Sequence, residues 1–130
     1  MDTSRTIYRC DHFHLRSRDA VSAARFYVEA LGAREIRRDG APVVSRVVLD
    51  VGGVTLFIEQ APAEIGPSPQ PPHLGIEHIG LAVDDIDAAM ADLRGRGITI
   101  VSEIMDARPG LRMAFIDAPD AVRIEILERR

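Results

Sequence analysis

The stretch "GIEHIGLAVDD", residues 75–85, places His78 in a segment that otherwise has the apolar character of a β-strand. It ends with an aspartate seven positions after that histidine. Much earlier, "YRCDHFHLRSRD", residues 8–19, places His12 at the same distance before its own final aspartate. A short carboxylate accepts hydrogen bonds from the free N–H groups of a first helical turn. The chain therefore twice predicts a strand with a histidine, followed by the start of a helix.

Each of these stretches opens the same order of predicted elements. In the first half, strands are predicted at residues 8–15, 33–38, 43–51 and 54–60, with a helix that begins after Asp19 and ends at Gly32. In the second half, strands are predicted at residues 76–83, 98–104, 111–117 and 122–128, with a helix that begins after Asp84 or Asp85 and ends at Gly95 to Gly97. Both halves have the order β-α-β-β-β, and this internal repeat predicts an α+β fold of two βαβββ units.

The segment between the two repeats has a different composition. "APAEIGPSPQPPHLG", residues 61–75, contains five of the eight prolines of the chain and has no hydrophobic periodicity. Such a segment is typical of an extended linker. We therefore predict a first module at residues 1–60, a proline-rich linker at 61–75, and a second module at 76–130.

Composition limits the function classes. With 46% hydrophobic and 28% charged residues, the chain is typical of a globular protein with a sizeable core. The net charge of −4 gives no support for binding to nucleic acid or to a membrane surface. All 16 basic residues are arginine, which excludes Schiff-base chemistry on lysine. A single cysteine, Cys10, and the lack of an apolar leader or membrane-spanning run lead us to expect a cytoplasmic protein.

Three ionisable residues are predicted to lie on corresponding faces of their strands. Side chains on a strand alternate between two faces, and His12, His78 and Glu125 fall on the face away from the helix of their own repeat. Two imidazoles and one carboxylate bind a divalent transition ion and leave positions open for water or substrate. The alternative is that each histidine is only a hydrogen-bonded residue of a half-buried strand. The same register in both repeats favours the metal site.

Three segments carry a resemblance to a known family: "DHFHLRSRDAVSAARFYVEALGA", "EHIGLAVDDIDAAMADLRGRGI" and "FIDAPDAVRIEIL". They resemble the vicinal oxygen chelate superfamily, which includes glyoxalase I, methylmalonyl-CoA epimerase, fosfomycin-resistance transferases, extradiol dioxygenases and bleomycin-binding proteins. The resemblance covers residues 8–128, although Ala121 stands where a glycine is usual. It implies a glyoxalase-like fold, with curved mixed sheets around a shared cleft. It also implies that His12, His78 and Glu125 hold one divalent transition metal per site: zinc, nickel, cobalt, manganese or iron.

The resemblance leaves the fourth ligand of the glyoxalase and epimerase members open. Aligning "GVTLFIE" with "AVRIEIL" places Phe57 at that position, where it is also a candidate wall of the substrate cavity. Glu59 lies two residues further on the same face and is a candidate fourth ligand or catalytic base. His14 shares the face of His12 and is a second candidate for the base.

Two arginines complete the candidate site. Arg16 and Arg123 lie on cleft faces and are candidates to bind a substrate carboxylate or phosphate through two parallel hydrogen bonds. The alternative for each is a solvated arginine at the rim.

The resemblance implies a function as well. We expect a metal-dependent lyase or isomerase of glyoxalase or epimerase type, acting on a small oxygenated and anionic substrate. The alternatives are an extradiol-type dioxygenase or an epoxide-opening transferase with three protein ligands, and a ligand-sequestering resistance protein without catalysis. We also expect a two-fold homodimer, with each metal site formed either within one chain or across the two chains.

Overall fold

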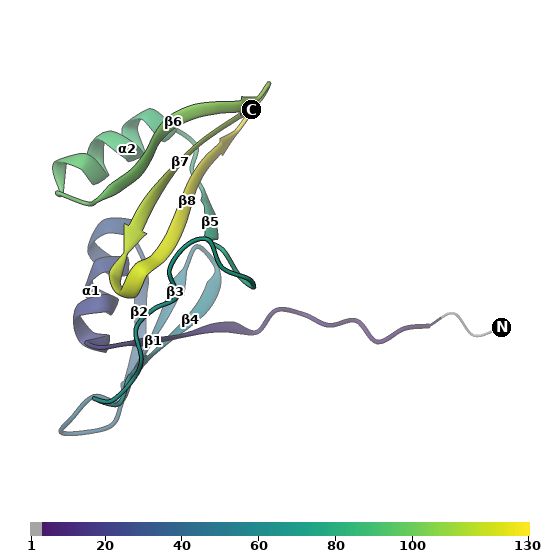
Figure 1. The fold of residues 1–130 in the computed structure, drawn as a ribbon. Coiled ribbons are helices and arrows are strands. Elements are labelled where there is room, and N and C mark those ends of the chain that lie inside the picture. The colour runs from purple at the N-terminus through teal and green to yellow at the C-terminus, as the bar shows by residue number, and fades with distance from the viewer. Residues whose placement is uncertain (1–3) are drawn as a thin grey trace.

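The computed structural model of the protein describes residues 4–130 and divides them into two modules (Figure 1). The first module consists of β1 (His12–Ser17), α1 (Ala20–Leu31), β2 (Arg34–Asp39), β3 (Arg46–Val51) and β4 (Val54–Gln60). Its four strands form sheet A in the order β1-β4-β3-β2. The β1–β4 pair is parallel, and the other two pairs are antiparallel.

The second module repeats this topology. It consists of β5 (Ile79–Ala82), α2 (Ile86–Gly95), β6 (Ile100–Arg108), β7 (Leu111–Ala118), a short 3-10 turn (Pro119–Ala121) and β8 (Val122–Arg129). Sheet B has the strand order β5-β8-β7-β6, again with a parallel first pair. The predicted α+β fold of two βαβββ units with mixed sheets is therefore confirmed. Figure 1 shows the modules one above the other, with α1 and α2 on the same side of the molecule.

The two helices begin where the aspartates predict. Asp19 accepts a hydrogen bond from the N–H of Ser22 at 3.0 Å, and Asp85 accepts one from Ala88 at 3.0 Å. The left-handed backbone of Gly32, with φ of 69°, ends α1. Each helix thus begins shortly after the strand that contains His12 or directly follows His78.

The core lies between each sheet and its own helix. Alternate residues of the strands pack on the apolar stripe of the helix, while the intervening residues face away. In the first module the fully buried side chains include Tyr27, Val47, Leu49 and Ile58; in the second they include Ile86, Ile116, Ile124 and Ile126. Burial of one such aliphatic side chain stabilises the fold by about 1.5–3 kcal/mol. The opposite face of each sheet carries the candidate site residues, together with apolar side chains such as Val48 and Leu127.

Several strand boundaries differ from the prediction: β3 begins at Arg46 instead of residue 43, and β6 extends to Arg108 instead of residue 104. Two further differences concern the candidate site. The first strand begins at His12 instead of Tyr8, because its only neighbour, β4, begins at Val54 and pairs Thr55 with His12. Residues 8–11 therefore have no strand beside them, and Figure 1 shows this N-terminal part extending away from the body. The fifth strand begins at Ile79, so that His78 lies directly before the strand instead of within it.

The connection between the modules, residues 61–78, contains turns but neither a helix nor a strand. Within residues 4–130, no helix has both the length and the apolar character needed to cross a membrane.

Candidate metal site

Sheet B brings two of the three candidate ligands together. The Nε2 atom of His78 lies 3.4 Å from Oε2 of Glu125, and the Glu125 side chain is only 16% exposed. Glu125 sits opposite Gly80 in the β5–β8 register. A Cβ atom at position 80 would lie 3.9 Å from the nearer Glu125 oxygen, so the glycine leaves room around the carboxylate. We call His78 and Glu125 the sheet B half-site.

Sheet A presents the third candidate ligand on its corresponding face. The ring of His12 stacks on Phe57, with 4.2 Å between the ring centroids. His14, two residues further along β1, meets the edge of the same Phe57 ring at 6.0 Å. Phe57 is thus an apolar wall that holds the His12 ring in one orientation. We call His12 and Phe57 the sheet A half-site.

Each candidate ligand histidine is also bonded to the acidic residue before it. Nδ1 of His12 lies 2.7 Å from Oδ2 of Asp11, and Nδ1 of His78 contacts the carboxylate of Glu77. Histidines that bind metals usually donate their second ring N–H to a carboxylate, which fixes the tautomer and makes the other nitrogen a better ligand. In both repeats this pairing leaves Nε2 available. The donor set therefore fits a divalent transition ion.

The sequence analysis did not identify Asp11 and Glu77 as functional candidates. The signal was present, because an acidic residue directly precedes the candidate histidine in both repeats. Within a strand, however, neighbouring side chains point to opposite faces, so that alternation alone does not predict a contact between a histidine ring and the carboxylate before it. His78 lies just outside β5, and Asp11 just outside β1. At the strand ends the backbone is free to bring both carboxylates to the ring.

One chain does not bring the three ligands together. Within the described part of the chain, no group of three histidine, cysteine, aspartate or glutamate side chains lies close enough to hold a metal ion. His78 and Glu125 adjoin each other on sheet B, and His12 lies on sheet A.

The candidate position for a fourth ligand is occupied by an apolar side chain, Phe57. In sheet A, Phe57 pairs with the residue two positions after His12; in sheet B, Glu125 pairs with the residue two positions after His78. Phe57 is thus the counterpart of Glu125 in the repeat.

Glu59, the other candidate for the fourth ligand, pairs with Arg16 in the β1–β4 ladder. It therefore lies further from His12 than Phe57 does, because Phe57 pairs with His14. Its carboxylate accepts hydrogen bonds from Nε of Arg16 and from Nε2 of His14, each at 3.2 Å, and Arg46 approaches to 3.8 Å. The hydrogen bond and charge of Arg16, with a smaller contribution from His14, hold the pKa of Glu59 below its usual value. Glu59 is therefore a carboxylate held in its charged form, which orients His14.

Arg123, the second candidate substrate arginine, lies on β8 two residues before Glu125. Its Nε atom is buried and makes no hydrogen bond within residues 4–130, and the nearest carboxylate, Asp117, is 3.8 Å away. A buried donor without a partner carries a desolvation cost. Arg123 thus has an unused hydrogen-bond donor beside the sheet B half-site.

Comparison with known proteins gives a family match over most of the chain. Residues 9–126 match the model of the Glyoxalase/Bleomycin resistance protein/Dioxygenase superfamily. The uncharacterized protein YaeR of Escherichia coli is 32% identical over 60 residues. That match spans 46% of the chain and 46% of the length of YaeR.

Solved structures of similar fold cover nearly the whole chain. A glyoxalase family protein from Enterococcus faecalis is 25% identical with a TM-score of 0.73, over 92% of this chain and 97% of its own. The fosfomycin resistance protein FosX from Listeria monocytogenes is 14% identical with a TM-score of 0.74, over 96% of both chains. At that identity the likeness to FosX extends to the fold alone.

Proposed function

Because the chain belongs to the Glyoxalase/Bleomycin resistance protein/Dioxygenase superfamily, we propose that it is a metal-dependent lyase or isomerase acting on a small oxygenated, anionic substrate. The observation that carries this proposal is the pair of oriented histidines. His12 and His78 have equivalent positions in the two repeats, each with Nδ1 bonded to a carboxylate. The Nε2 atom of His78 is directed to Glu125, the third candidate ligand.

His12, His78 and Glu125 would hold the metal. A divalent ion bound by two imidazoles and a carboxylate polarises substrate oxygens as a Lewis acid and stabilises negative charge that develops on them. The 3.4 Å separation between His78 and Glu125 supports their sharing one ion. Zinc, nickel, cobalt, manganese and iron are all compatible with this donor set.

The separation of the half-sites supports a site formed by two copies of the chain. β1 and β5 are the edge strands of their sheets, so that each has unpaired backbone groups along one side. We propose a two-fold homodimer in which β1 of one copy lies near β5 of the other. Each dimer then has two equivalent sites, with His12 from one copy and His78 and Glu125 from its partner.

His14 is the residue we assign to proton transfer. Its Nε2 is hydrogen-bonded to Glu59, which leaves Nδ1 to take up or release a proton. Glu59 itself is a weak base, because Arg16 keeps its pKa low. Glu59 thus orients the imidazole, and it stabilises the positive charge that the ring gains on protonation. Arg16 and Arg123 supply positive charge for an anionic group of the substrate. Arg16 donates its Nε to Glu59, whereas Nε of Arg123 has no hydrogen-bond partner in the described residues.

Proton exchange into candidate substrates tests this function. The metal-loaded protein should exchange the α-proton of a 2-hydroxy-ketone or a 2-methyl-acyl thioester with solvent deuterium. Glu59→Gln and His14→Gln should each slow this exchange by about 100-fold or more, the usual contribution of a general base. Glu35→Gln changes an exposed glutamate of β2 that is paired with Arg38, and should leave the rate unchanged. Exchange that persists unchanged in both test variants would exclude the proton-transfer role.

Phe57 favours a second candidate function. With an apolar side chain where a fourth ligand would lie, the metal keeps more open positions, as dioxygen chemistry or epoxide-opening group transfer requires. Iron in protein purified without chelators, together with oxygen uptake on addition of a catechol, would support this candidate over the first. Binding of an intact ligand, with neither exchange nor turnover, would instead support a sequestering protein.

A further inference from the structure

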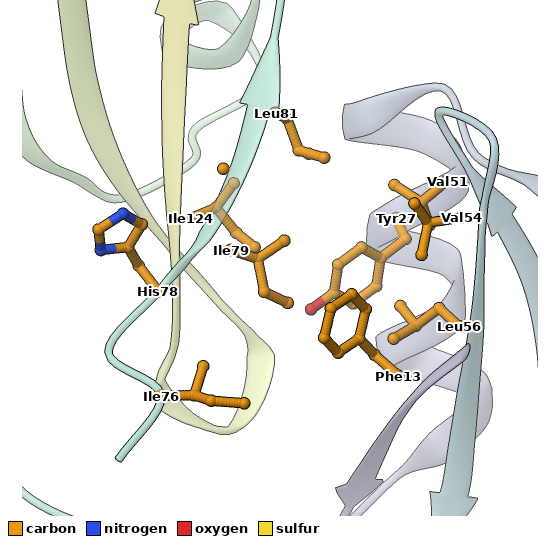
Figure 2. Close-up of a pocket in the computed structure, with 11 residues that line it drawn as sticks. Phe13, Tyr27, Val51, Val54, Leu56, Ile76, His78, Ile79, Leu81 and Ile124 are labelled. Atoms are coloured by element: carbon orange, nitrogen blue, oxygen red, sulfur yellow. The ribbon is translucent and has the colours of Figure 1, made fainter. Parts of the chain in front are cut away.

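A cavity lies between the two modules. It is lined by residues of β1, β4 and α1 from the first module and of β5 and β8 from the second. Its volume is about 380 Å³. Side chains of both modules line it, among them Phe13, Tyr27, Val54, Leu56, Ile79 and Leu81 (Figure 2). Apart from the tyrosine, these side chains are hydrocarbon. The cavity is large enough for a small molecule, since ligand pockets begin at about 300 Å³.

The cavity and the candidate metal site lie on opposite faces of the same strands. Phe13 is the residue between His12 and His14, and alternation directs it toward the helix side of sheet A. Figure 2 shows Ile79 directed into the cavity and the ring of its neighbour, His78, directed away from it. His78 borders the cavity, but its ring points away from it, so that the imidazole is left to the metal.

Tyr27 supplies the one hydroxyl directed into the cavity. The residue is 2% exposed, and its hydroxyl oxygen has no hydrogen-bond partner in the described residues. Figure 2 shows this oxygen between the side chains of Phe13 and Ile79. Burial, with a smaller contribution from the charge of Asp120, raises the pKa of the Tyr27 hydroxyl, which therefore remains a neutral donor.

A water molecule is a poor partner for this hydroxyl. Buried waters are held by two to four polar groups. The lining side chains besides Tyr27 are hydrocarbon except for His78, whose ring is directed away from the cavity. A buried hydroxyl without a partner costs about 1–3 kcal/mol. A mainly apolar molecule with one acceptor atom would both accept a hydrogen bond from the Tyr27 hydroxyl and fill the cavity.

We propose that this cavity is a binding site for a small, mainly apolar molecule that carries one hydrogen-bond acceptor, such as a ketone, for Tyr27. The site adjoins the proposed metal site at His78 but needs neither the metal nor its activity. The hydrocarbon side chains provide most of the binding energy by burial, and the tyrosine selects for the acceptor.

Two matched probes test the proposal. Acetophenone carries a carbonyl oxygen, and ethylbenzene has a similar shape without it. Both should shift the methyl NMR signals of Ile79 and Leu81 in the full-length protein. Acetophenone should bind about 2- to 12-fold more tightly than ethylbenzene, the effect of one hydrogen bond. In Tyr27→Phe this preference should disappear while ethylbenzene still binds.

Further variants locate the site and separate it from the metal site. Val54→Trp should block both probes by filling the cavity, whereas Val43→Trp, at an exposed valine outside its lining, should not. His12→Ala, which removes a candidate metal ligand outside the cavity lining, should bind both probes as the wild type does. A folded wild-type protein whose Ile79 and Leu81 signals respond to neither probe would overturn the proposal. An unchanged preference for acetophenone in Tyr27→Phe would overturn the role of the hydroxyl.

Discussion

Phe57 of sheet A lies at the position that Glu125 occupies in sheet B. Each belongs to the strand parallel to the first strand of its module, opposite the residue two positions after the candidate ligand histidine. The two repeats thus keep one histidine each but differ at the second position. An aromatic wall faces His12 where a carboxylate faces His78. The proposed metal site would therefore have three protein ligands in place of four.

Replacing Phe57 by a carboxylate tests whether position 57 is equivalent to that of Glu125. In Phe57→Glu, a carboxylate beside His12 should complete a four-ligand set and tighten metal binding by about tenfold or more, equal to about 1.4 kcal/mol. Phe57→Leu, which keeps the wall apolar, should not tighten it. Competition with a metal-binding dye measures both affinities. Equal affinities in the two variants would show that position 57 does not face the metal.

The acidic residues before the histidines should tune metal affinity. Asp11→Asn and Glu77→Gln leave the candidate ligands in place but remove the carboxylates that hold Nδ1 of each ring. Each should weaken metal binding by about 10- to 100-fold, the usual effect of losing such a partner. Glu64→Gln, at an exposed glutamate of the connection between the modules, serves as the control. Unchanged affinity in both test variants would contradict the assignment of Nε2 as the ligand atom.

The turn before β8 should be stabilised by a glycine. Ala121 has a φ of 60°, in the left-handed region that a Cβ atom disfavours. Ala121→Gly relieves this strain at a smaller cost in chain entropy, so we expect a gain of about 0.5–1 kcal/mol in the free energy of unfolding. Ala118→Gly, where φ is −97°, should instead destabilise the protein. Urea unfolding of both variants measures the difference, and a less stable Ala121→Gly protein would contradict it.

Glu128 should make the stability of the second module depend on pH. Its carboxylate accepts a hydrogen bond from the N–H of Ile86 at 3.0 Å, at the start of α2. This bond, with a further contribution from Arg130, holds the pKa of Glu128 below its usual value. A lowered pKa stabilises the fold above the unfolded-state pKa of about 4.3. This stabilisation is lost as the pH falls through the lower value of the folded state.

Glu128→Gln should therefore melt several degrees below the wild type at neutral pH, and the difference should shrink as the pH falls below about 4. Thermal unfolding followed by circular dichroism at a series of pH values measures this. A constant difference from pH 7 to pH 2.5 would exclude the charge of Glu128 as its cause.

The repeat made most of the fold predictable from the sequence. Asp19 and Asp85 mark the starts of both helices, and strand alternation accounts for the burial of Leu56, Ile58, Ile124 and Ile126 in the core. The start of β1 was misplaced because the length of a strand depends on its neighbour. Tyr8 has strand character, but β4 does not extend far enough to pair with it.

The arrangement of the site was less predictable. Alternation states which face of a strand a residue occupies, but it does not give the distance between faces of two separate sheets. The sequence therefore indicated His12, His78 and Glu125 as one set. It did not show that, within one chain, His12 lies apart from the other two. The unpartnered hydroxyl of Tyr27 depends on how the two modules pack, and no local pattern reports this.

Mixing two inactive variants tests the proposed shared site most directly. His12→Ala and His78→Ala should each lose metal, because each removes one ligand from every site. After subunit exchange, half of the dimers are mixed, and one of the two sites in each is intact. Metal analysis should then find about a quarter of the sites restored. No metal retention after proven exchange, with metal bound by the wild type, would contradict a site shared between two copies.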